Sequence, residues 1–178
     1  KLRVVPASFA DFQINFEAAE AVFNEKTAAV LINTPNNPSG AVYTEETLRR
    51  LAQVLTEKSR QYGHTIFLVS DEPYREIVFD GKKQAYPALF YPHTLSCYSF
   101  SKSLSVPGER VGYVAVTPDC EQADKMVAMM GQISRGLGHN CPSSLPMLAS
   151  AECLEVTSDL SVYETNMNLL YDTFVELG

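Results

Sequence analysis

Hydrophobic positions along the chain follow two patterns: short unbroken apolar runs, and longer stretches in which apolar residues recur at helical spacing. The apolar runs have the length and composition of buried β-strands. They cover Leu2 to Ala7, Ala28 to Ile32, Thr65 to Val69, Leu95 to Phe100 and Val111 to Val116. Unbroken apolar strands that alternate with helices are typical of a parallel sheet covered on both faces. The pattern therefore predicts a three-layer α/β/α fold around a mainly parallel sheet.

The stretches with helical spacing predict helices between and after these strands. Asn15 and Thr44 are suited to cap the first two helices, and Gly63 suits the C-terminal end of the second. Their apolar faces are formed by Phe16, Ala19 and Phe23 in the first helix and by Leu48, Leu51, Ala52 and Leu55 in the second. Helices with one apolar face pack that face on a sheet.

The last two strands differ from the others because no helix fits between them. We therefore expect the strand over Val111 to Val116 to run antiparallel to its neighbour. Three further helices are expected after it, the first opened by Thr117 to Asp119 and the second by Pro142. We expect the stripe of the first to pack in the core, and its members are Met126, Met129, Met130 and Ile133. The apolar face of the last helix is formed by Leu160, Tyr163, Met167, Leu170 and Phe174.

Composition and charge narrow the class of protein. The chain has 178 residues, of which 46% are hydrophobic and 20% are charged, as in one soluble globular domain with a substantial core. The net charge of -7 and the lack of a basic run exclude a nucleic-acid surface. No apolar run is long enough to span a membrane, and the N-terminus lacks the order of a signal peptide, so we expect a cytoplasmic location.

The cysteines and the chain ends add two expectations. The four cysteines are expected to be reduced and mostly buried, because they show neither close pairing nor metal-type spacing with histidines. They are Cys97, Cys120, Cys141 and Cys153. The chain starts at Lys1, already strand-like and without methionine, and it stops at Gly178 immediately after a helix. We therefore expect it to be a piece of a longer chain.

Polar residues gather where the predicted parallel strands end. The loop over Asn33 to Gly40 follows one strand and contains Asn37, and Asp71 follows the next strand. In open α/β sheets the ligand crevice lies beyond the carboxyl ends of the strands, so Asn37 and Asp71 are expected to meet there. An ordinary strand-to-helix turn and a capping aspartate are the alternative interpretations.

A third strand end carries the residues with the most specific chemistry. The strand over Leu95 to Phe100 carries Ser99 at its end and is followed by Ser101 and Lys102, and Arg110 comes shortly after. A lysine amine that a site makes nucleophilic condenses with an aldehyde to a Schiff base. Hydroxyls and an arginine fork suit a phosphate dianion. Together they suggest a phosphorylated aldehyde cofactor, of which pyridoxal phosphate is the obvious case.

Four segments of the chain match a known family in order and spacing. They are Asn33 to Gly40, Asp71 to Tyr74, Ser99 to Lys102 and Gly108 to Tyr113. This set resembles the signature of fold-type I pyridoxal-phosphate aminotransferases of the aspartate aminotransferase class. The resemblance runs through nearly the whole chain but covers less than half of a usual family member.

The resemblance implies a role for each site residue. Lys102 would form the Schiff base with pyridoxal 5'-phosphate and, once released, move the proton between the substrate α-carbon and the cofactor. Asp71 would face the pyridine nitrogen and keep it protonated. Tyr74 and Asn37 would donate hydrogen bonds to the phenolic oxygen of the ring. Two further residues, Ser99 and Arg110, would hold the phosphate, with Ser101 as a helper.

The resemblance also implies what lies outside this chain. Residues 1–158 would be part of the cofactor-binding large domain, and residues 159–178 the start of a helix leading to a C-terminal small domain. Upstream strands of the family's sheet would be missing, so the strand over Leu2 to Ala7 should lose its neighbour and the strand over Val111 to Val116 should become an exposed edge. Exposed edges recruit partners. We therefore expect the chain alone to be inactive and either to self-associate through abnormal strand pairing or to leave its N-terminal strand detached.

For the complete protein the resemblance implies a homodimer that transfers an amino group between an amino acid and a 2-oxo acid. Arg135 lies roughly where some members place an arginine that reaches the neighbouring subunit's site to bind an acidic side chain, and a plain surface arginine is the alternative. A carbon-sulfur β-lyase or a cyclopropane-forming enzyme shares the visible motifs. A transcriptional regulator with an aminotransferase-like cofactor-sensing domain is another alternative. A plain nucleotide-binding domain is disfavoured because no glycine-rich phosphate fingerprint follows a strand.

Overall fold

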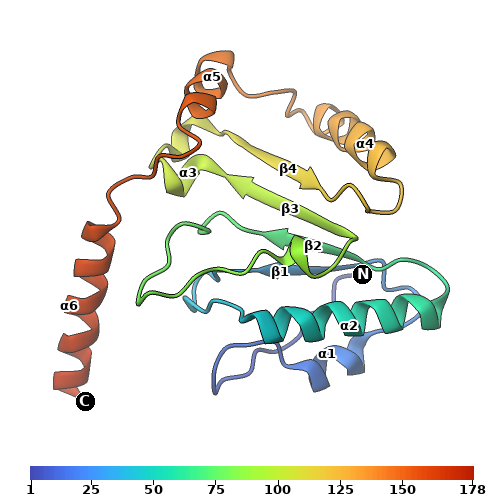
Figure 1. The fold of residues 1–178 in the computed structure, drawn as a ribbon, viewed down its shortest axis with the longest axis horizontal. Helices are drawn as coiled ribbons and strands as arrows, with labels where there is room; N and C mark the ends of the chain where they lie inside the picture. Colours follow the sequence, from blue (N-terminus) through green and yellow to red (C-terminus); the bar gives the residue numbers. More distant parts are fainter.

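The centre of the molecule is a four-stranded sheet in the order β1-β2-β3-β4 (Figure 1). Its strands are β1 (Ala29–Asn33), β2 (Phe67–Asp71), β3 (Thr94–Ser99) and β4 (Gly112–Val116). The computed structural model describes residues 1–178. The first three strands are parallel, and β4 pairs antiparallel with β3. The predicted α/β fold with a mainly parallel sheet, one antiparallel strand and flanking helices is confirmed.

Two capped helices flank the first half of the sheet, α1 (Phe16–Val22) and α2 (Glu45–Tyr62). The Asn15 side chain accepts a hydrogen bond from the Ala18 N–H at 3.0 Å, and the Thr44 hydroxyl accepts one from the Thr47 N–H at 3.1 Å. Each bond satisfies an N–H that has no partner inside its helix. Gly63 ends α2 with φ of +72°, a left-handed conformation that glycine adopts without steric cost. All three predicted caps are confirmed.

The main hydrophobic core lies between these helices and the first two strands. It contains ten buried residues: Phe16, Ile32, Leu48, Leu51, Ala52, Val54, Leu55, Ile66, Leu68 and Tyr91. Burying one such leucine fully stabilises the fold by about 1.5–3 kcal/mol. The predicted apolar face of α2 is therefore the face that holds the sheet.

The predicted strand over Leu2 to Ala7 is wrong. The segment has no regular structure, and Leu2 and Val4 are 87% and 78% exposed. A strand needs a neighbour for its backbone hydrogen bonds, and none of the four strands pairs with this segment. Within this single chain the segment is detached from the sheet, and the expected self-association stays a prediction. The expectation that β4 forms an exposed sheet edge is confirmed.

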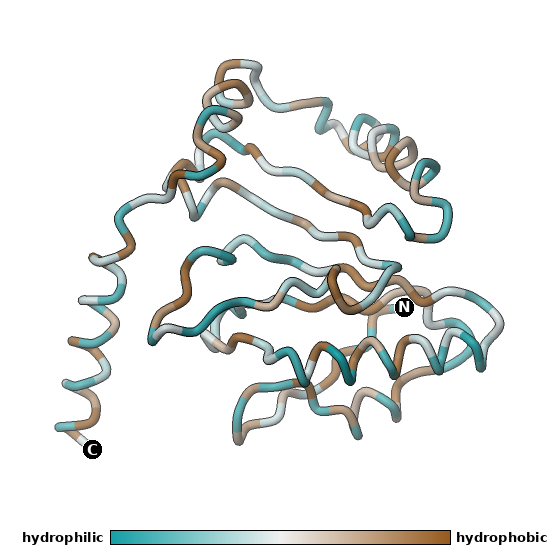
Figure 2. The backbone as a smooth tube through the Cα atoms, viewed as in Figure 1, coloured by the Kyte–Doolittle hydropathy of each residue, from teal (hydrophilic) through white to brown (hydrophobic).

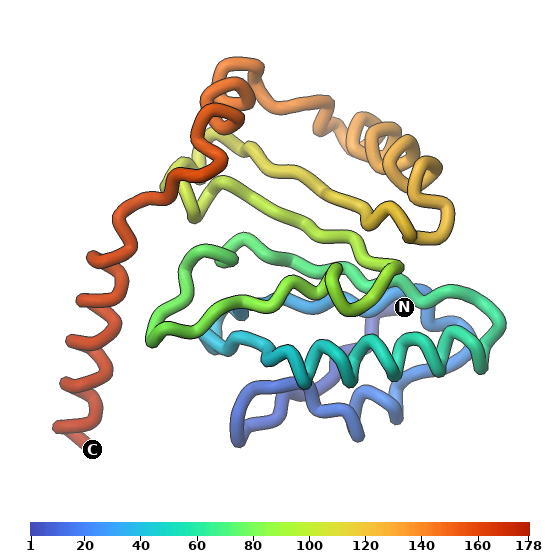
Figure 3. The backbone as a smooth tube through the Cα atoms, viewed as in Figure 1, coloured from blue at the N-terminus to red at the C-terminus, as the bar shows by residue number.

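The C-terminal part of the chain consists of helices with few buried residues. They are α3 (Phe100–Ser103), α4 (Ala123–Gly136), α5 (Ser144–Glu152) and α6 (Ser161–Leu177). Two short 3-10 turns also occur, η1 (Pro87–Leu89) before β3 and η2 (Pro107–Glu109) before β4. Figure 3 follows the chain through these helices to its C-terminus at the free end of α6, away from the sheet. No helix is both long and apolar enough to cross a membrane.

The expected core packing of the α4 stripe is also wrong. No residue of α4 is buried, and Met129 and Ile133 are 56% and 54% exposed. Hydrophobic and hydrophilic positions alternate along α4 and α6 as they do along α2 (Figure 2), but no layer covers the apolar positions of α4 and α6. The cysteines are all free, as predicted, but only Cys120 is buried and Cys141 is exposed.

Candidate functional site

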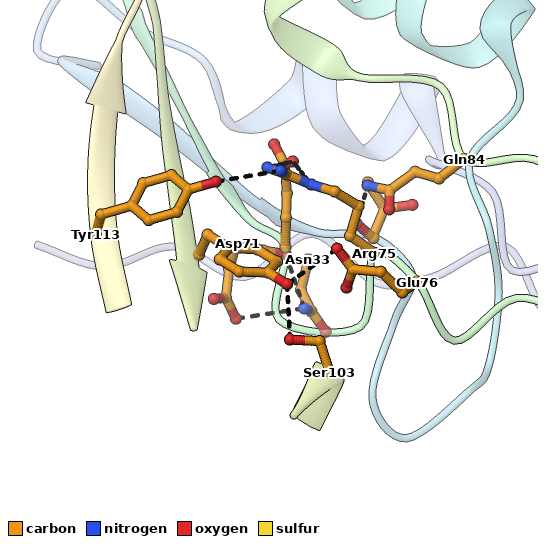
Figure 4. Close-up of polar contacts among 10 residues, drawn as sticks. Asn33, Asp71, Arg75, Glu76, Gln84, Ser103 and Tyr113 are labelled. Atoms are coloured by element: carbon orange, nitrogen blue, oxygen red, sulfur yellow. Dashed lines mark hydrogen bonds and ion pairs between the residues drawn. The ribbon is translucent and has the colours of Figure 1, made fainter. Parts of the chain in front are cut away.

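The parallel strands β1 and β2 bring two polar residues together at their carboxyl ends. The register pairs Asn33 with Asp71 directly across the two strands. The Asn33 side-chain Nδ2 donates to the Asp71 backbone oxygen at 3.0 Å and to Asp71 Oδ2 at 3.3 Å. Figure 4 shows this contact at the edge of the sheet. The sequence pattern placed Asp71 here, but it gave Asn33 no role.

Three of the predicted site residues meet just beyond this edge. Asn37, in the loop after β1, donates through Nδ2 to the Tyr74 hydroxyl at 2.8 Å. Lys102, in α3 after β3, places its Nζ 5.7 Å from the centre of the Tyr74 ring. Tyr74 itself lies in the turn after β2. Segments that follow three different strands therefore converge on one tyrosine.

The electrostatics of Asp71 suit a carboxylate that faces a cation. Burial raises the pKa of Asp71 above its ordinary value, and the neighbouring Glu72 raises it further. Both causes act against the charged form. A cationic group placed beside Asp71 would reverse this penalty, because opposite charges within a few ångströms favour the ionised carboxylate.

A buried ion pair supports the turn that carries Tyr74. Glu72 is fully buried, and its Oε2 lies 2.7 Å from the Arg75 guanidinium. The guanidinium also donates to the Tyr113 hydroxyl on β4 at 3.3 Å (Figure 4). It stacks over the Tyr98 ring at 4.7 Å. This network was not predicted from the sequence, although an acid and a base three positions apart after a buried strand were a visible signal.

A second tyrosine anchors the helix that carries Lys102. The Tyr98 hydroxyl donates to Glu76 Oε1 at 2.9 Å and lies 2.8 Å from Ser103 Oγ. Burial raises the pKa of Tyr98 to about 12, so this hydroxyl keeps its proton at neutral pH. Because Ser103 is buried and follows Lys102 directly, its anchoring fixes where the lysine leaves the backbone.

The predicted phosphate residues lie next to one another on the backbone. Ser99 Oγ accepts a hydrogen bond from the Ser101 N–H at 3.2 Å and lies 2.7 Å from Ser101 Oγ. Ser99 pairs with Gly112 across β3 and β4. A Cβ at Gly112 would stand 2.3 Å from the Tyr98 backbone oxygen, so only glycine fits there. This close approach explains the glycine in the segment from Gly108 to Tyr113.

Arg110 departs from the expected arrangement. Its backbone lies two residues before Gly112, beside the serines, and adopts a left-handed conformation with φ of +53°. Its side chain is exposed and turns back, so that Nη1 donates to the Pro107 carbonyl at 2.5 Å. The structure therefore brings the Arg110 backbone to the serines while the guanidinium contacts its own turn. Arg135 lies exposed on α4, and its role stays a prediction.

Fold and site together define an α/β domain in which a lysine, an aspartate, a tyrosine and an asparagine gather at the carboxyl ends of the parallel strands. The family profile described as "Aminotransferase class I and II" matches residues 1–174, and the chain belongs to this family. A probable aspartate/prephenate aminotransferase of Aquifex aeolicus is 38% identical to it over 127 residues, which are 69% of this chain and 30% of that protein.

Solved structures show the same relationship. An aminotransferase from Eubacterium rectale superimposes with a TM-score of 0.95 and 45% identity, over 98% of this chain and 44% of that one. An aspartate aminotransferase from Thermotoga maritima superimposes with a TM-score of 0.83 and 26% identity, over 100% of this chain and 45% of that one. The chain therefore spans less than half the length of the proteins it matches.

Proposed function

We propose that the complete protein is a pyridoxal-phosphate-dependent aminotransferase that exchanges an amino group between an amino acid and a 2-oxo acid. The observation that carries this proposal is the convergence of Lys102, Tyr74 and Asn37 beside Asp71, at the ends of three neighbouring strands. Pyridoxal-phosphate chemistry requires an amine, a negative charge opposite the ring nitrogen and a pair of hydrogen-bonding groups.

The residues present fit the cofactor. Asp71 is a half-buried carboxylate whose pKa is raised by burial and by Glu72, so a cationic ring nitrogen would offset an existing penalty. Asn37 and Tyr74 are already joined by a hydrogen bond, and Lys102 Nζ lies 5.7 Å from the centre of the Tyr74 ring. For the phosphate, the Ser99 and Ser101 hydroxyls lie side by side, and the Arg110 side chain needs only to swing away from Pro107.

When bound, pyridoxal phosphate supplies an aldehyde carbon and a ring that withdraws electrons from the substrate α-carbon. Lys102 Nζ would hold the cofactor and then carry the substrate α-proton as general base and acid. Asp71 would keep the proton on the ring nitrogen by remaining ionised beside it. Asn37 and Tyr74 would orient the ring through its phenolic oxygen.

The names of relatives support transfer rather than elimination. Proteins similar to this chain are called aspartate/prephenate, aspartate and aromatic-amino-acid aminotransferases. We extend to this protein only the word that these names share, aminotransferase, and infer from it an amino acid as donor and a 2-oxo acid as acceptor. Residues 1–158 would belong to the cofactor-binding domain and residues 159–178 to the helix leading out of it, in keeping with the exposure of every residue of α6. The cytoplasmic location and the homodimer stay predictions.

The experiment compares the complete protein with Lys102→Ala after pyridoxal phosphate is added. A lysine-dependent absorbance band and keto acid formed in proportion to the consumed acceptor are the expected results. Release of ammonia and pyruvate without an acceptor would show that the protein catalyses elimination and not transamination. An unchanged band in Lys102→Ala would remove Lys102 from the site.

A further inference from the structure

The side chain of Asn33 makes four hydrogen bonds in the candidate site, although the sequence assigned it no role. Its Nδ2 donates to the backbone oxygen and to Oδ2 of Asp71, at 3.0 and 3.3 Å. Its Oδ1 accepts from the Asn37 N–H at 2.8 Å and from Asn36 Nδ2 at 3.2 Å. A carboxamide offers two donor hydrogens and one oxygen with two lone pairs, so this amide is used on both sides.

These contacts connect Asp71 and Asn37 to the side-chain amide of Asn33. Asn33 is the last residue of β1, paired in register with Asp71, so the sheet fixes its backbone. Its amide plane then fixes the orientation of the Asp71 carboxylate by engaging Oδ2, which leaves Oδ1 for a ligand. On the other side it holds the backbone of Asn37, whose side chain reaches Tyr74.

We propose that Asn33 is a positioning residue of the cofactor site, whose single amide sets the Asp71 carboxylate and the Asn37 side chain in fixed relation to each other. This inference rests on the proposed function, because Asp71 and Asn37 are the groups assigned to the two sides of the cofactor ring. Functional groups need support of this kind, since small errors in their placement weaken binding and catalysis.

The charges around Asp71 make a neutral donor at position 33 important. Glu72 lies next to Asp71 in sequence and is paired with Arg75. Cys97 lies opposite Asp71 on β3, and burial together with Asp71 and Glu72 raises the pKa of its thiol, so it is uncharged at neutral pH. On the β1 side Asn33 provides an N–H to the carboxylate, and a hydrogen bond to the charged form favours that form.

Two variants separate the two halves of the amide. Asn33→Ala removes the contacts to Asp71 and to Asn37 together. Asn33→Asp keeps an oxygen for the Asn37 N–H but turns the donor toward Asp71 into a second carboxylate oxygen. Asn36→Ala is the matched control, because it alters the same loop and loses a contact to Asn33 without touching Asp71.

The measurement is pyridoxal phosphate binding to the complete protein as a function of pH, with thermal unfolding as a check on the fold. We expect Asn33→Ala to weaken binding about tenfold, as for the loss of a hydrogen bond to a charged group. In Asn33→Asp the added negative charge raises the pKa of Asp71. Protonation of Asp71 then occurs at higher pH, and the acid loss of binding moves up by about one pH unit.

The outcomes distinguish this inference from the proposed function. If the unaltered protein does not bind pyridoxal phosphate, the proposed function fails, and the role of Asn33 fails with it. If the unaltered protein binds pyridoxal phosphate, the two Asn33 variants are compared with Asn36→Ala. Equal affinities, and equal pH values at which binding is lost in acid, would overturn only the role of Asn33. Should Asn33→Ala not fold, Asn33→Asp decides, because it keeps the loop anchor.

Discussion

Helices α2 and α4 carry the same kind of apolar stripe but meet opposite surroundings. Six residues of α2 are buried, and Leu48 and Leu55 are 2% and 0% exposed. In α4 none is buried, and Met129 and Ile133 are more than half exposed. The first helix lies on the parallel strands β1 and β2, whereas the second lies beyond the edge strand β4 (Figure 1).

The spacing of apolar residues predicts which face of a helix is apolar, but not whether that face is buried. The spacing of apolar residues decides which face of a helix is apolar, because it depends only on helix geometry. Whether that face is covered depends on what packs against it, and hydrophobic stabilisation arises only from area removed from water. We therefore expect the two halves of the chain to respond very differently to equivalent substitutions.

The largest effect is expected from truncating a buried side chain of α2. Leu55→Ala should lower the free energy of unfolding by about 4 kcal/mol, because it leaves a cavity in the core. Met129→Ala in α4 is the matched control and should change it by less than about 0.5 kcal/mol. Urea denaturation of both variants measures the difference, and equal losses would show that α4 is covered in solution.

A smaller effect is expected from the buried ion pair between Glu72 and Arg75 in the turn after β2. Arg75→Met should lower the free energy of unfolding by about 3 kcal/mol, because it leaves the buried Glu72 carboxylate without its partner. Arg49→Met removes the exposed pair with Glu45 on α2, in which both side chains are about two-thirds exposed, and should cost less than about 0.5 kcal/mol.

The same denaturation assay applies to both ion-pair variants. If Arg75→Met cost as little as Arg49→Met, the Glu72 carboxylate would have to be reached by water in solution.

The smallest effect is expected from two glycines on β4 and α4, in the part of the molecule with few buried residues. Gly112→Ala should lower the free energy of unfolding by about 2 kcal/mol, because its Cβ collides with the Tyr98 backbone oxygen. Gly131→Ala in α4 meets no atom within 4 Å and should instead raise it by about 0.5–1 kcal/mol, through helix propensity. Thermal unfolding of both variants reports the opposite signs, and a neutral Gly112→Ala would mean that β4 detaches from β3.

The parts of the fold set by local rules could be predicted from the sequence. Asn15, Thr44 and Gly63 form the helix caps expected of them, since capping depends on the residue and its immediate neighbours. The antiparallel direction of β4 followed from the short connection before it. By contrast, Leu2 to Ala7 has the composition of a strand but finds no partner, because pairing depends on distant segments.

The candidate site divides in the same way. Asp71 and Lys102 could be located because each stands at the carboxyl end of an apolar strand, and Tyr74 because its segment resembles a family motif. The role of Asn33 could not, because it depends on the register that places it opposite a residue 38 positions away. The direction of the Arg110 side chain could not be predicted either, because the local sequence does not indicate its hydrogen bond to the Pro107 carbonyl.

The distance in sequence between paired strands also orders the steps by which this molecule forms. Closing a long loop costs more chain entropy than closing a short one, and pairing of remote segments slows folding. We therefore expect β3 and β4, which are joined only by α3 and η2, to pair early and to set the Lys102 backbone before β1 docks on β2. Asn33 and Asp71 come into contact only when β1 docks on β2. The candidate site is therefore completed at the end of folding, and binding of its ligand would show that folding is complete.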